Sequence, residues 1–376
     1  MDFELSSDEA LIQKTARDFA AARILPVASA NERAGRFPEE IFRELARLGL
    51  MAVTTPAALG GAGATTVAYS VAMTEVARAC ASTAVGMAVN NMVCEIVTRF
   101  GTDAQCSRVV PPLTGGEGVG AFALTEPHCG SDAQALRATA RAVGDTWVLN
   151  GTKTFITNGG YALFVVAWAK TLAGISTFIV PRGAPGLRVG REEDKCGIRA
   201  SNTVELHFED CVVPREALLG DDGKGFRVAM SALDGGRIGV ASQSLGIGLA
   251  ATDAAAKYAK ERTAFGRPIA DFQAIAFMLA DSTTELEASR LLTLRAARAK
   301  DSGQPFSRAA AMAKVFTTEA ATRACHRAVQ VHGGYGYIRE FPVERYLRDV
   351  RVTSLYEGTS EIQRLVIARD LLRSGV

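Results

Sequence analysis

Five short segments of the chain combine glycine with hydroxyl, amide or charged side chains at points where regular patterning breaks off. Glycine lets a backbone approach a ligand closely, and free N–H and hydroxyl groups can hydrogen-bond a phosphate or the polar edge of a ring. Such segments are candidates for binding a phosphorylated cofactor or substrate, although any one of them alone is more often an ordinary loop. They are residues 124–132, 153–159, 261–266, 330–334 and 356–360.

None of the five segments is one of the common nucleotide-binding loops. The chain has no GxGxxG turn that follows a strand and opens a helix, and it has no GxxxxGK[ST] loop. A dinucleotide would therefore have to be bound by another arrangement. A metal centre is not expected either, because the four histidines have no second ligand at helical spacing and no two of the seven cysteines form a CxxC pair.

The elements that position these segments fall into three regions, and the first, up to residue 120, is helical. Ser6 and Glu9 have the spacing of a capping box, and the helix that follows is expected to end before Pro26. A second helix is expected to open at Pro38, where a proline can stand in the first turn. Alanine-rich runs predict two further helices, over residues 66–79 and 83–100.

The region from residue 121 to residue 222 has short β-rich runs separated by Gly and Pro. The dipeptide Asn150–Gly151, placed between two such runs, predicts a hairpin turn. We therefore expect a small β domain. Its predicted strands cover residues 146–149, 164–168, 176–180 and 203–208.

Long helical patterns return after Gly223 and predict a bundle. The expected fold class is thus α+β, with an N-terminal α-helical domain (1–120), a middle β domain (121–222) and a C-terminal four-helix bundle (223–376). Alanine occurs on several faces of the bundle, which suits either one thick core or, with a slight preference, faces buried against other subunits. The predicted helices cover residues 224–260, 270–301, 306–332 and a last stretch from Thr359.

Composition narrows the class of partner. Hydrophobic residues make up 48% of the chain and charged residues 22%, which is typical of a folded domain protein with a sizeable core. The net charge is only +2 and the basic residues are scattered, so neither a nucleic acid nor an anionic membrane is expected as a partner. No stretch has the signature of a signal peptide or membrane span, and the odd number of cysteines suits free thiols, so we expect a cytoplasmic protein.

Taken together and in order, the five segments resemble those of the acyl-CoA dehydrogenase family, most closely its short-chain-like members, over essentially the whole chain. The resemblance implies the three-domain fold described above, usually as a homotetramer, with FAD as cofactor. The matching motifs are Ala-Leu-Thr-Glu-Pro from residue 123, Asn-Gly-Thr-Lys-x-Phe-Ile-Thr-Asn-Gly from 150, Arg-x-x-Phe-Gly from 262, Gln-x-x-Gly-Gly-Tyr-Gly from 330 and Tyr-Glu-Gly-Thr-Ser-Glu-Ile-Gln-Arg from 356.

The resemblance assigns one group of residues to FAD and another to the substrate. Since the family shares each flavin between two subunits, oligomerisation and cofactor binding should be linked. The implied FAD-binding residues are Phe122, Leu124, Thr125, Ser131, Phe155, Thr157, Arg262, Ala264, Phe265, Phe272, Gln273, Gln330, Gly333, Gly334, Thr359 and Glu361. The implied substrate-binding residues are Ser131, Asp234, Arg237 and Gly358.

Two departures from the family pattern stand near these residues. His128 and Cys129 occupy positions where relatives usually carry small or polar residues, and His128 is expected to be a solvent-facing turn residue rather than a ligand of the cofactor or CoA. Phe155 stands where many relatives have Trp, so the surface that stacks on the flavin is smaller.

The resemblance also implies that Glu357 is the catalytic base. A carboxylate in water is far too weak a base for the α proton of a thioester, but burial beside a neutral flavin raises its pKa, and polarisation of the thioester carbonyl by backbone N–H groups acidifies the carbon. One branch of the family carries its glutamate directly before the arginine of an Asp-x-x-Arg pair. In this chain that position is Gly236, which has no side chain, so Glu357 is the expected base.

The expected reaction is oxidation of an acyl-CoA to its trans-2-enoyl-CoA, with electrons passed to an electron-transferring flavoprotein. Three alternatives stay open at this point. An oxygen-using acyl-CoA oxidase is disfavoured by the lack of a long C-terminal extension, and a non-catalytic acyl-CoA-binding member is disfavoured because Glu357, Thr157 and Arg262 are all in place. The third alternative is a dehydrogenase of acyl groups bound to a carrier protein. The sequence does not define the length or branching of the acyl chain.

Overall fold

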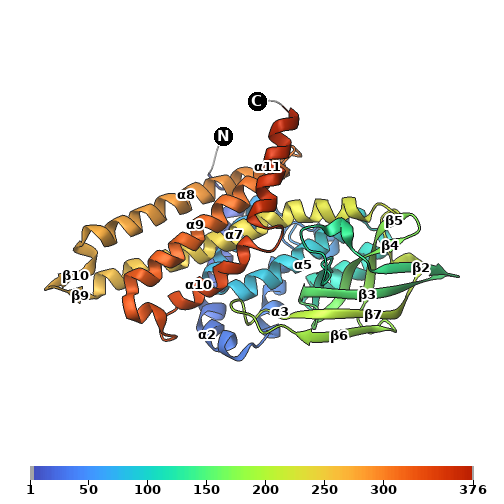
Figure 1. The fold of residues 1–376 in the computed structure, drawn as a ribbon, viewed down its shortest axis with the longest axis horizontal. Coiled ribbons are helices and arrows are strands. Elements are labelled where there is room, and N and C mark those ends of the chain that lie inside the picture. Colours follow the sequence, from blue (N-terminus) through green and yellow to red (C-terminus); the bar gives the residue numbers. More distant parts are fainter. Residues whose placement is uncertain (1–3, 375–376) are drawn as a thin grey trace.

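The computed structural model describes residues 4–374 and shows the three expected regions, so the predicted α+β architecture is confirmed (Figure 1). No helix within the described residues is long and apolar enough to cross a membrane. The N-terminal helices are α1 (Ser7–Phe19), α2 (Leu25–Ala34), α3 (Glu39–Arg47), α4 (Thr66–Ala79), α5 (Ala81–Phe100) and α6 (Asp103–Thr114).

The first helix begins as predicted but does not end as predicted. The Ser6 hydroxyl accepts from the Glu9 N–H and the Glu9 carboxylate accepts from the Ser6 N–H, which confirms the capping box. The chain does not break before Pro26, however: a π-helical turn, Ala20–Ile24, leads directly into α2. Pro26 follows directly after this π-helical turn, and because proline has no N–H the continuous helix lacks one backbone hydrogen bond there.

The middle region is a single eight-stranded sheet in the order β6-β7-β3-β2-β4-β5-β8, with β1 pairing parallel to β4. The largest side chains of its core include Trp168 and Phe178, both fully buried. The strands are β1 (Val119–Ala123), β2 (Thr139–Val143), β3 (Thr146–Thr157), β4 (Ala162–Thr171), β5 (Gly174–Pro181), β6 (Leu187–Glu192), β7 (Thr203–Pro214) and β8 (Leu218–Leu219).

The hairpin predicted at Asn150–Gly151 is wrong, because both residues lie inside β3. The pairing of β3 with β7 shifts register between Leu149 and Gly151, so the dipeptide forms an irregularity in a continuous strand. The Asn150 side chain bonds Asp210 of β7, accepting from its N–H at 2.8 Å and donating to its carboxylate at 3.0 Å. A Cβ at position 151 would lie 2.7 Å from the Ala138 Cβ, so glycine here serves a close approach of backbones.

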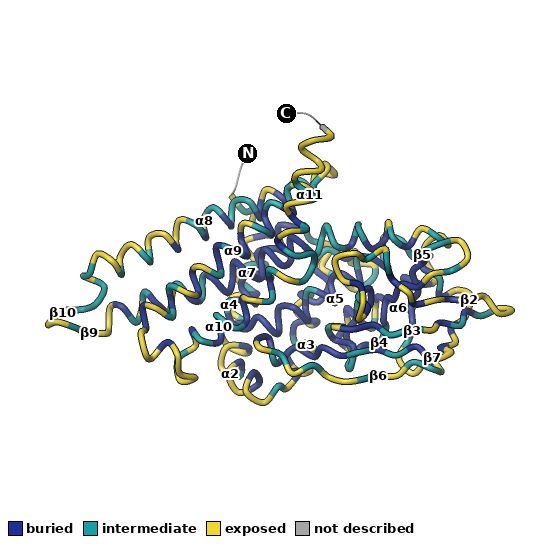
Figure 2. The backbone as a smooth tube through the Cα atoms, viewed as in Figure 1, coloured by how far each residue is buried: buried dark blue, intermediate teal, exposed yellow. Residues whose placement is uncertain are grey.

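The C-terminal region is built around α7, which runs from the β domain to the far end of the molecule (Figure 1). Its buried residues pack against α4, α5 and α9, whereas the first part of α8, most of α11 and the β9–β10 hairpin are largely exposed (Figure 2). One helix, α10, was not predicted. The elements are α7 (Gly225–Glu261), β9 (Thr263–Ala264), β10 (Arg267–Pro268), α8 (Gln273–Asp301), α9 (Ser307–His332), α10 (Val343–Arg351) and α11 (Ser360–Ser374).

Candidate active site

Glu357 lies in a tight turn between α10 and α11, held in a conformation that a glutamate rarely adopts. Its φ is +55° and that of Gly358 is +85°, both in the left-handed region. The turn is fixed from several sides. Gln363 donates to the carbonyl oxygens of Glu357 (3.0 Å) and Gly358 (2.9 Å), and Lys314 Nζ donates to the Gly358 carbonyl at 2.7 Å. These contacts maintain the strained turn and thereby orient the Glu357 side chain.

The carboxylate of Glu357 is enclosed although the residue as a whole is only partly buried. Its Oε2 atom is sealed from solvent and has no hydrogen-bond partner within residues 4–374. Burial raises the pKa of Glu357 to about 7, while the positive charges of Arg237 and Lys314 oppose that rise. A carboxyl that titrates near neutral pH, with one oxygen free of partners, has the properties of a general base.

Lys314 is a functional candidate that the sequence reasoning missed. Its side chain is fully buried on α9, and besides contacting the Gly358 carbonyl it lies close enough to Glu357 for their charges to interact. Burial lowers the pKa of Lys314 to about 8, which the negative charge of Glu357 opposes. The available signal was a single lysine among the apolar and small residues of the 309–315 run.

Helix α7 brings the Asp-x-x-Arg pair and Gly236 next to the same carboxylate. Arg237 is buried and its Nη1 lies 2.5 Å from Asp234 Oδ1, which also accepts from the Ser307 hydroxyl at 2.8 Å. A Cβ at position 236 would lie 2.8 Å from Glu357 Oε2. The helical position and the loop position therefore converge on one place, and only a glycine on α7 leaves room for Glu357.

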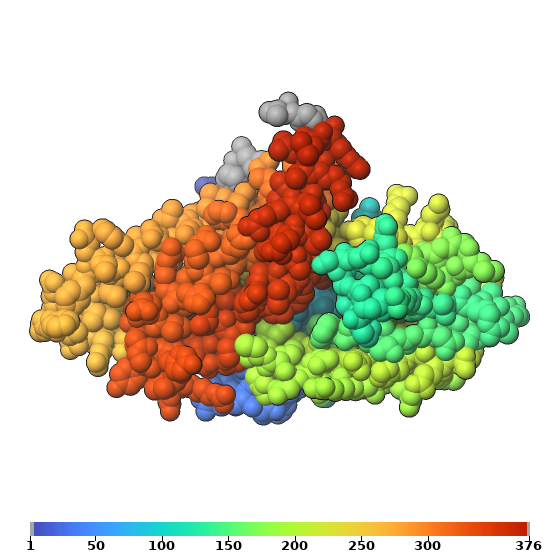
Figure 3. Space-filling view, in the orientation of Figure 1, coloured from blue at the N-terminus to red at the C-terminus, as the bar shows by residue number. Residues whose placement is uncertain are grey.

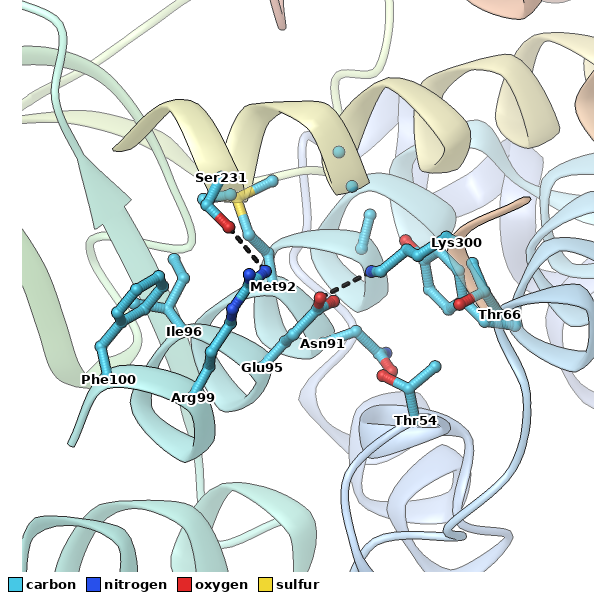
Figure 4. A pocket seen from close by; sticks show the side chains of 15 residues that line it. Thr54, Thr66, Asn91, Met92, Glu95, Ile96, Arg99, Phe100, Ser231 and Lys300 are labelled. Carbon is cyan, nitrogen blue, oxygen red and sulfur yellow. Dashed lines mark hydrogen bonds and ion pairs between the residues drawn. The ribbon is translucent and has the colours of Figure 1, made fainter. Parts of the chain in front are cut away.

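A narrow cavity opens beside this point, between α4, α5, α7 and the end of α8 (Figure 4). Its volume is about 20 Å³. Met92, Ile96 and Ala232 give part of the lining an apolar character, while an ion pair, Glu95 with Lys300, stands across it. Gly236 also lines this cavity, so the cavity lies next to the candidate base.

The residues assigned to the flavin ring lie on β1, in the loop that follows it and on β3, and a buried ion pair joins this loop to β3. Lys153 Nζ lies 2.8 Å from Glu126 Oε1 and also donates to the Leu124 carbonyl at 3.1 Å, which fixes the segment that carries Thr125. Phe155 is 65% exposed at a φ of +59°, and its neighbour Thr157 is half-buried. An exposed aromatic ring beside threonine hydroxyl groups fits the face and polar edge of a flavin.

The remaining residues of this group lie on β1, in the loop that follows it and at the start of α11. Figure 3 shows a hollow between α11, in red, and the blue-green segment around residues 125–135. Phe122 is half-buried and its ring lies 4.4 Å from that of Trp168, whereas Ser131 is exposed in its loop. The Thr359 hydroxyl accepts from the Ile362 N–H at the start of α11, and Glu361 is exposed on that helix.

Glu126, His128 and Cys129 form a cluster that the sequence did not predict, with their ligand-type atoms within 4.8 Å of one another. Both oxygens of Glu126 already have donors, because Arg137 N–H lies 2.6 Å from one, and Lys153 and the Ala138 N–H bond the other. The Glu126 carboxylate thus stabilises the loop that follows β1, because its donors occupy both oxygens. His128 Nε2 lies 3.3 Å from the Ala135 carbonyl, so its contact is also within the loop.

A second group of predicted cofactor residues lies at the far end of the bundle. Arg262, Gly333 and Gly334 line one cavity of about 430 Å³, where the Arg262 guanidinium lies 5.7 Å from the centre of the Tyr335 ring. Within residues 4–374 no carboxylate pairs with Arg262. A guanidinium with free donors beside glycine backbone fits a diphosphate.

Other residues of this second group stand around the β9–β10 hairpin. Phe265 is 95% exposed at a φ of +52°, its ring 6.0 Å from that of the half-buried Phe272. Ala264 lies in β9, Gln273 opens α8 and the exposed Gln330 lies in the last turn of α9. The structure therefore brings these residues together but leaves them at the opposite half of the molecule from β3, the strand that carries Phe155 (Figure 1).

Comparison with known proteins gives matches along the whole chain. Family models of the N-terminal, middle and C-terminal domains of acyl-CoA dehydrogenases match residues 6–117, 121–211 and 223–372. The chain is 51% identical to the mitochondrial short-chain specific acyl-CoA dehydrogenase of Bos taurus, over 99% of this chain and 92% of that protein. It is 45% identical to a probable acyl-CoA dehydrogenase of Bacillus subtilis, over 99% of this chain and all of that protein.

Two solved structures have nearly the same fold. Butyryl-CoA dehydrogenase from Megasphaera elsdenii superimposes with a TM-score of 0.97 at 41% identity, covering 99% of this chain and 100% of that one. A chain from a study of the electron-transferring flavoprotein of Acidaminococcus fermentans superimposes with a TM-score of 0.98 at 43% identity, over 100% of both chains.

Proposed function

Since the chain belongs to the acyl-CoA dehydrogenase family, we propose that Glu357 is the base with which it removes the α proton of a short acyl-CoA thioester. The protein is an FAD-dependent oxidoreductase that converts acyl-CoA to trans-2-enoyl-CoA and passes the electrons to an electron-transferring flavoprotein. The observation that carries the assignment of the base is the enclosed, unpartnered Oε2 of Glu357, which lies against Gly236 at the edge of a cavity.

The chain's own residues supply binding, orientation and proton transfer. Arg237, held by Asp234, stands near the base on the α7 side, and the peptide of Gly358 is fixed by Lys314 and Gln363. Fixed backbone groups at this turn are suited to polarise the thioester carbonyl, because they need no reorganisation when charge develops. FAD supplies the hydride acceptor for the β carbon.

Two half-sites for FAD support an oligomer. Phe122, Leu124, Thr125, Phe155 and Thr157 belong to the β domain, whereas Arg262, Gly333 and Gly334 lie at the other end of the bundle. We assign the flavin ring to the first set and the diphosphate to the second set on a neighbouring subunit, in a homotetramer arranged as a dimer of dimers. All seven cysteines are free thiols, which supports a reducing compartment such as the cytoplasm.

Anaerobic stopped-flow measurement tests the function. Butyryl-CoA added to the FAD-loaded protein should bleach the flavin absorbance and yield crotonyl-CoA, and an electron-transferring flavoprotein should then reoxidise the enzyme faster than oxygen does. Peroxide formed as fast as the flavoprotein is reduced would favour the oxidase alternative. A butyryl group on acyl carrier protein that is oxidised faster than butyryl-CoA would favour the carrier-protein alternative. A flavin that no acyl thioester bleaches would favour a non-catalytic member.

A further inference from the structure

The cavity beside Glu357 has a polar obstruction at one side of an otherwise partly apolar lining. Lys300 Nζ lies 2.6 Å from Glu95 Oε1, with 17% of the lysine side chain and 35% of the glutamate side chain exposed. Figure 4 shows the two side chains pointing toward each other across the cavity, with Met92 and Ile96 on the other side of Glu95.

Two adjacent glycines of α7, Gly235 and Gly236, lie close to the ion pair and to the base, respectively. A Cβ at position 236 would lie 2.8 Å from Glu357 Oε2, and a Cβ at position 235 would lie 3.2 Å from Lys300 Nζ and 3.7 Å from Glu95 Oε2. Successive residues of a helix point about 100° apart around its axis, so the base and the ion pair face different sides of α7. Both glycines nevertheless line the same cavity as Glu95 and Lys300, so an alkyl chain that enters this cavity past Gly236 meets the ion pair.

The ion pair is held in place by the elements that carry it. Asp301, the residue after Lys300, accepts from the backbone N–H groups of Thr66 (2.7 Å) and Val67 (3.1 Å) at the start of α4. This contact fixes the end of α8 on α4, while Glu95 projects from the last third of α5. The packing of these helices thus fixes the backbone positions from which the two charged side chains meet.

Space and solvation both disfavour a longer chain. A cavity needs about 10–15 Å³ to hold one water molecule, so a volume of about 20 Å³ has room for one or two small groups. An alkyl tail pushed against the ion pair would remove water from two charges and gain little apolar contact in return.

We propose that the Glu95–Lys300 ion pair is the floor of the acyl site and restricts the enzyme to short acyl chains such as butyryl. The inference rests on the proposed function, because it takes the cavity beside Glu357 as the place of the acyl chain. It assigns chain-length selection to two charged side chains on α5 and α8 that do not touch the reacting carbons.

The test is the ratio of flavin-reduction rates with octanoyl-CoA and butyryl-CoA in the FAD-loaded enzyme. Replacing the pair with neutral, smaller residues (Glu95→Ala with Lys300→Ala) should raise that ratio at least tenfold, because the chain then finds both space and apolar surface. The matched control is Glu287→Ala with Arg290→Ala, which removes an exposed ion pair from the same helix α8 and should leave the ratio unchanged.

A second variant narrows the cavity instead of opening it. Gly235→Ala places a methyl group 3.2 Å from Lys300 Nζ, so it should lower the rate with butyryl-CoA several-fold more than the rate with propionyl-CoA. An unchanged octanoyl-to-butyryl ratio in the first variant, or an unchanged butyryl-to-propionyl ratio in the second, overturns the proposal.

A substrate with a terminal carboxylate tests whether the ion pair only closes the end of the acyl site or whether Lys300 binds a negatively charged group of the substrate. If Lys300 bound such a group, glutaryl-CoA would reduce the wild-type flavin faster than butyryl-CoA, and that result also overturns the proposal. Failure of every acyl-CoA to reduce the wild-type flavin would instead refute the proposed function, so the two failures are distinguishable.

Discussion

Glu357 carries two opposing influences that together place its pKa close to neutral. Enclosure of the carboxylate favours the neutral acid, and the nearby charges of Arg237 and Lys314 favour the anion. Only the anion can accept a proton, so flavin reduction should rise as the pH passes through about 7 and level off above it. Burial without the two cations would give a base that is protonated at neutral pH.

Glu357→Gln tests the base directly. Glutamine keeps the size of the side chain and the backbone of the turn, so the variant should retain FAD and bind butyryl-CoA. Flavin reduction in a stopped-flow experiment should fall by a factor of about 10³, which is within the range for loss of a general base. A variant that keeps more than a tenth of the wild-type rate would show that another group removes the proton.

Lys314→Met tests the electrostatic role of the second cation. Methionine retains much of the length of the lysine stem but not its charge, so the pKa of Glu357 should rise and the pH profile of flavin reduction should move to higher pH. Lys314→Arg should move the profile less, because it keeps the charge. Lys257→Met, at an exposed position of α7, is the control and should leave the profile in place. An unmoved profile in a well-folded Lys314→Met protein would argue for a purely structural lysine.

Some residues of the candidate site could be predicted from the sequence and others could not. Glu357, Arg237 and Arg262 stand in motifs, so a resemblance between short segments was enough to select them. Lys314 and Gln363 act on the turn through side chains that come from other positions on α9 and α11. Their role depends on which helix face meets the Glu357 turn, and only the packed structure shows that.

At the scale of the elements, patterning predicted long helices well and local turns less well. Residues 66–79 and 306–332 have strong helical patterning and correspond closely to α4 and α9. Asn150–Gly151 has the residue types of a hairpin turn, but pairing with both β2 and β7 keeps β3 continuous there. The local preference was overridden by neighbours distant in the sequence, which no short window contains.

A glutamate could reach the reacting carbon either from position 236 on α7 or from position 357 in the α10–α11 turn. Moving the glutamate from one position to the other tests whether both side chains reach the same place. A Cβ at position 236 would lie 2.8 Å from Glu357 Oε2, so a glutamate cannot be added there while residue 357 keeps its side chain. We expect Glu357→Gly to abolish turnover and Gly236→Glu in that background to restore part of it, measured as flavin reduction by butyryl-CoA. Gly236→Gln in the same background is the control, and equal rates for the Glu and Gln variants would contradict the swap.

At the scale of the whole molecule, part of the exposed apolar surface lies around the β9–β10 hairpin and the start of α8. The first nine residues of α8, within the described chain, contain no buried side chain, although Phe277 lies among them and is 58% exposed. Phe265 at the tip of the neighbouring hairpin is almost fully exposed. Of the two alternatives left open by the alanine-rich bundle, faces buried against other subunits agree better with this surface than one thick core.

Subunit complementation tests whether two chains build one flavin site. The Phe155→Ala, Thr157→Ala double variant damages the ring half-site, and Arg262→Ala damages the diphosphate half-site at the other end of the molecule. Each variant alone should lose FAD more readily than the wild type, as measured by bound flavin per chain after gel filtration. When the two variants are co-expressed with different tags, a mixed pair has one site with both defects and one site with neither. Each mixed pair should therefore regain tight FAD at one of its two sites, because oligomerisation and cofactor binding are linked. A tetramer purified through both tags can also contain unmixed pairs, so it should hold tight FAD at fewer than half of its sites but at more than either variant alone. If each chain instead binds FAD by itself, every site carries one defect and mixing restores nothing.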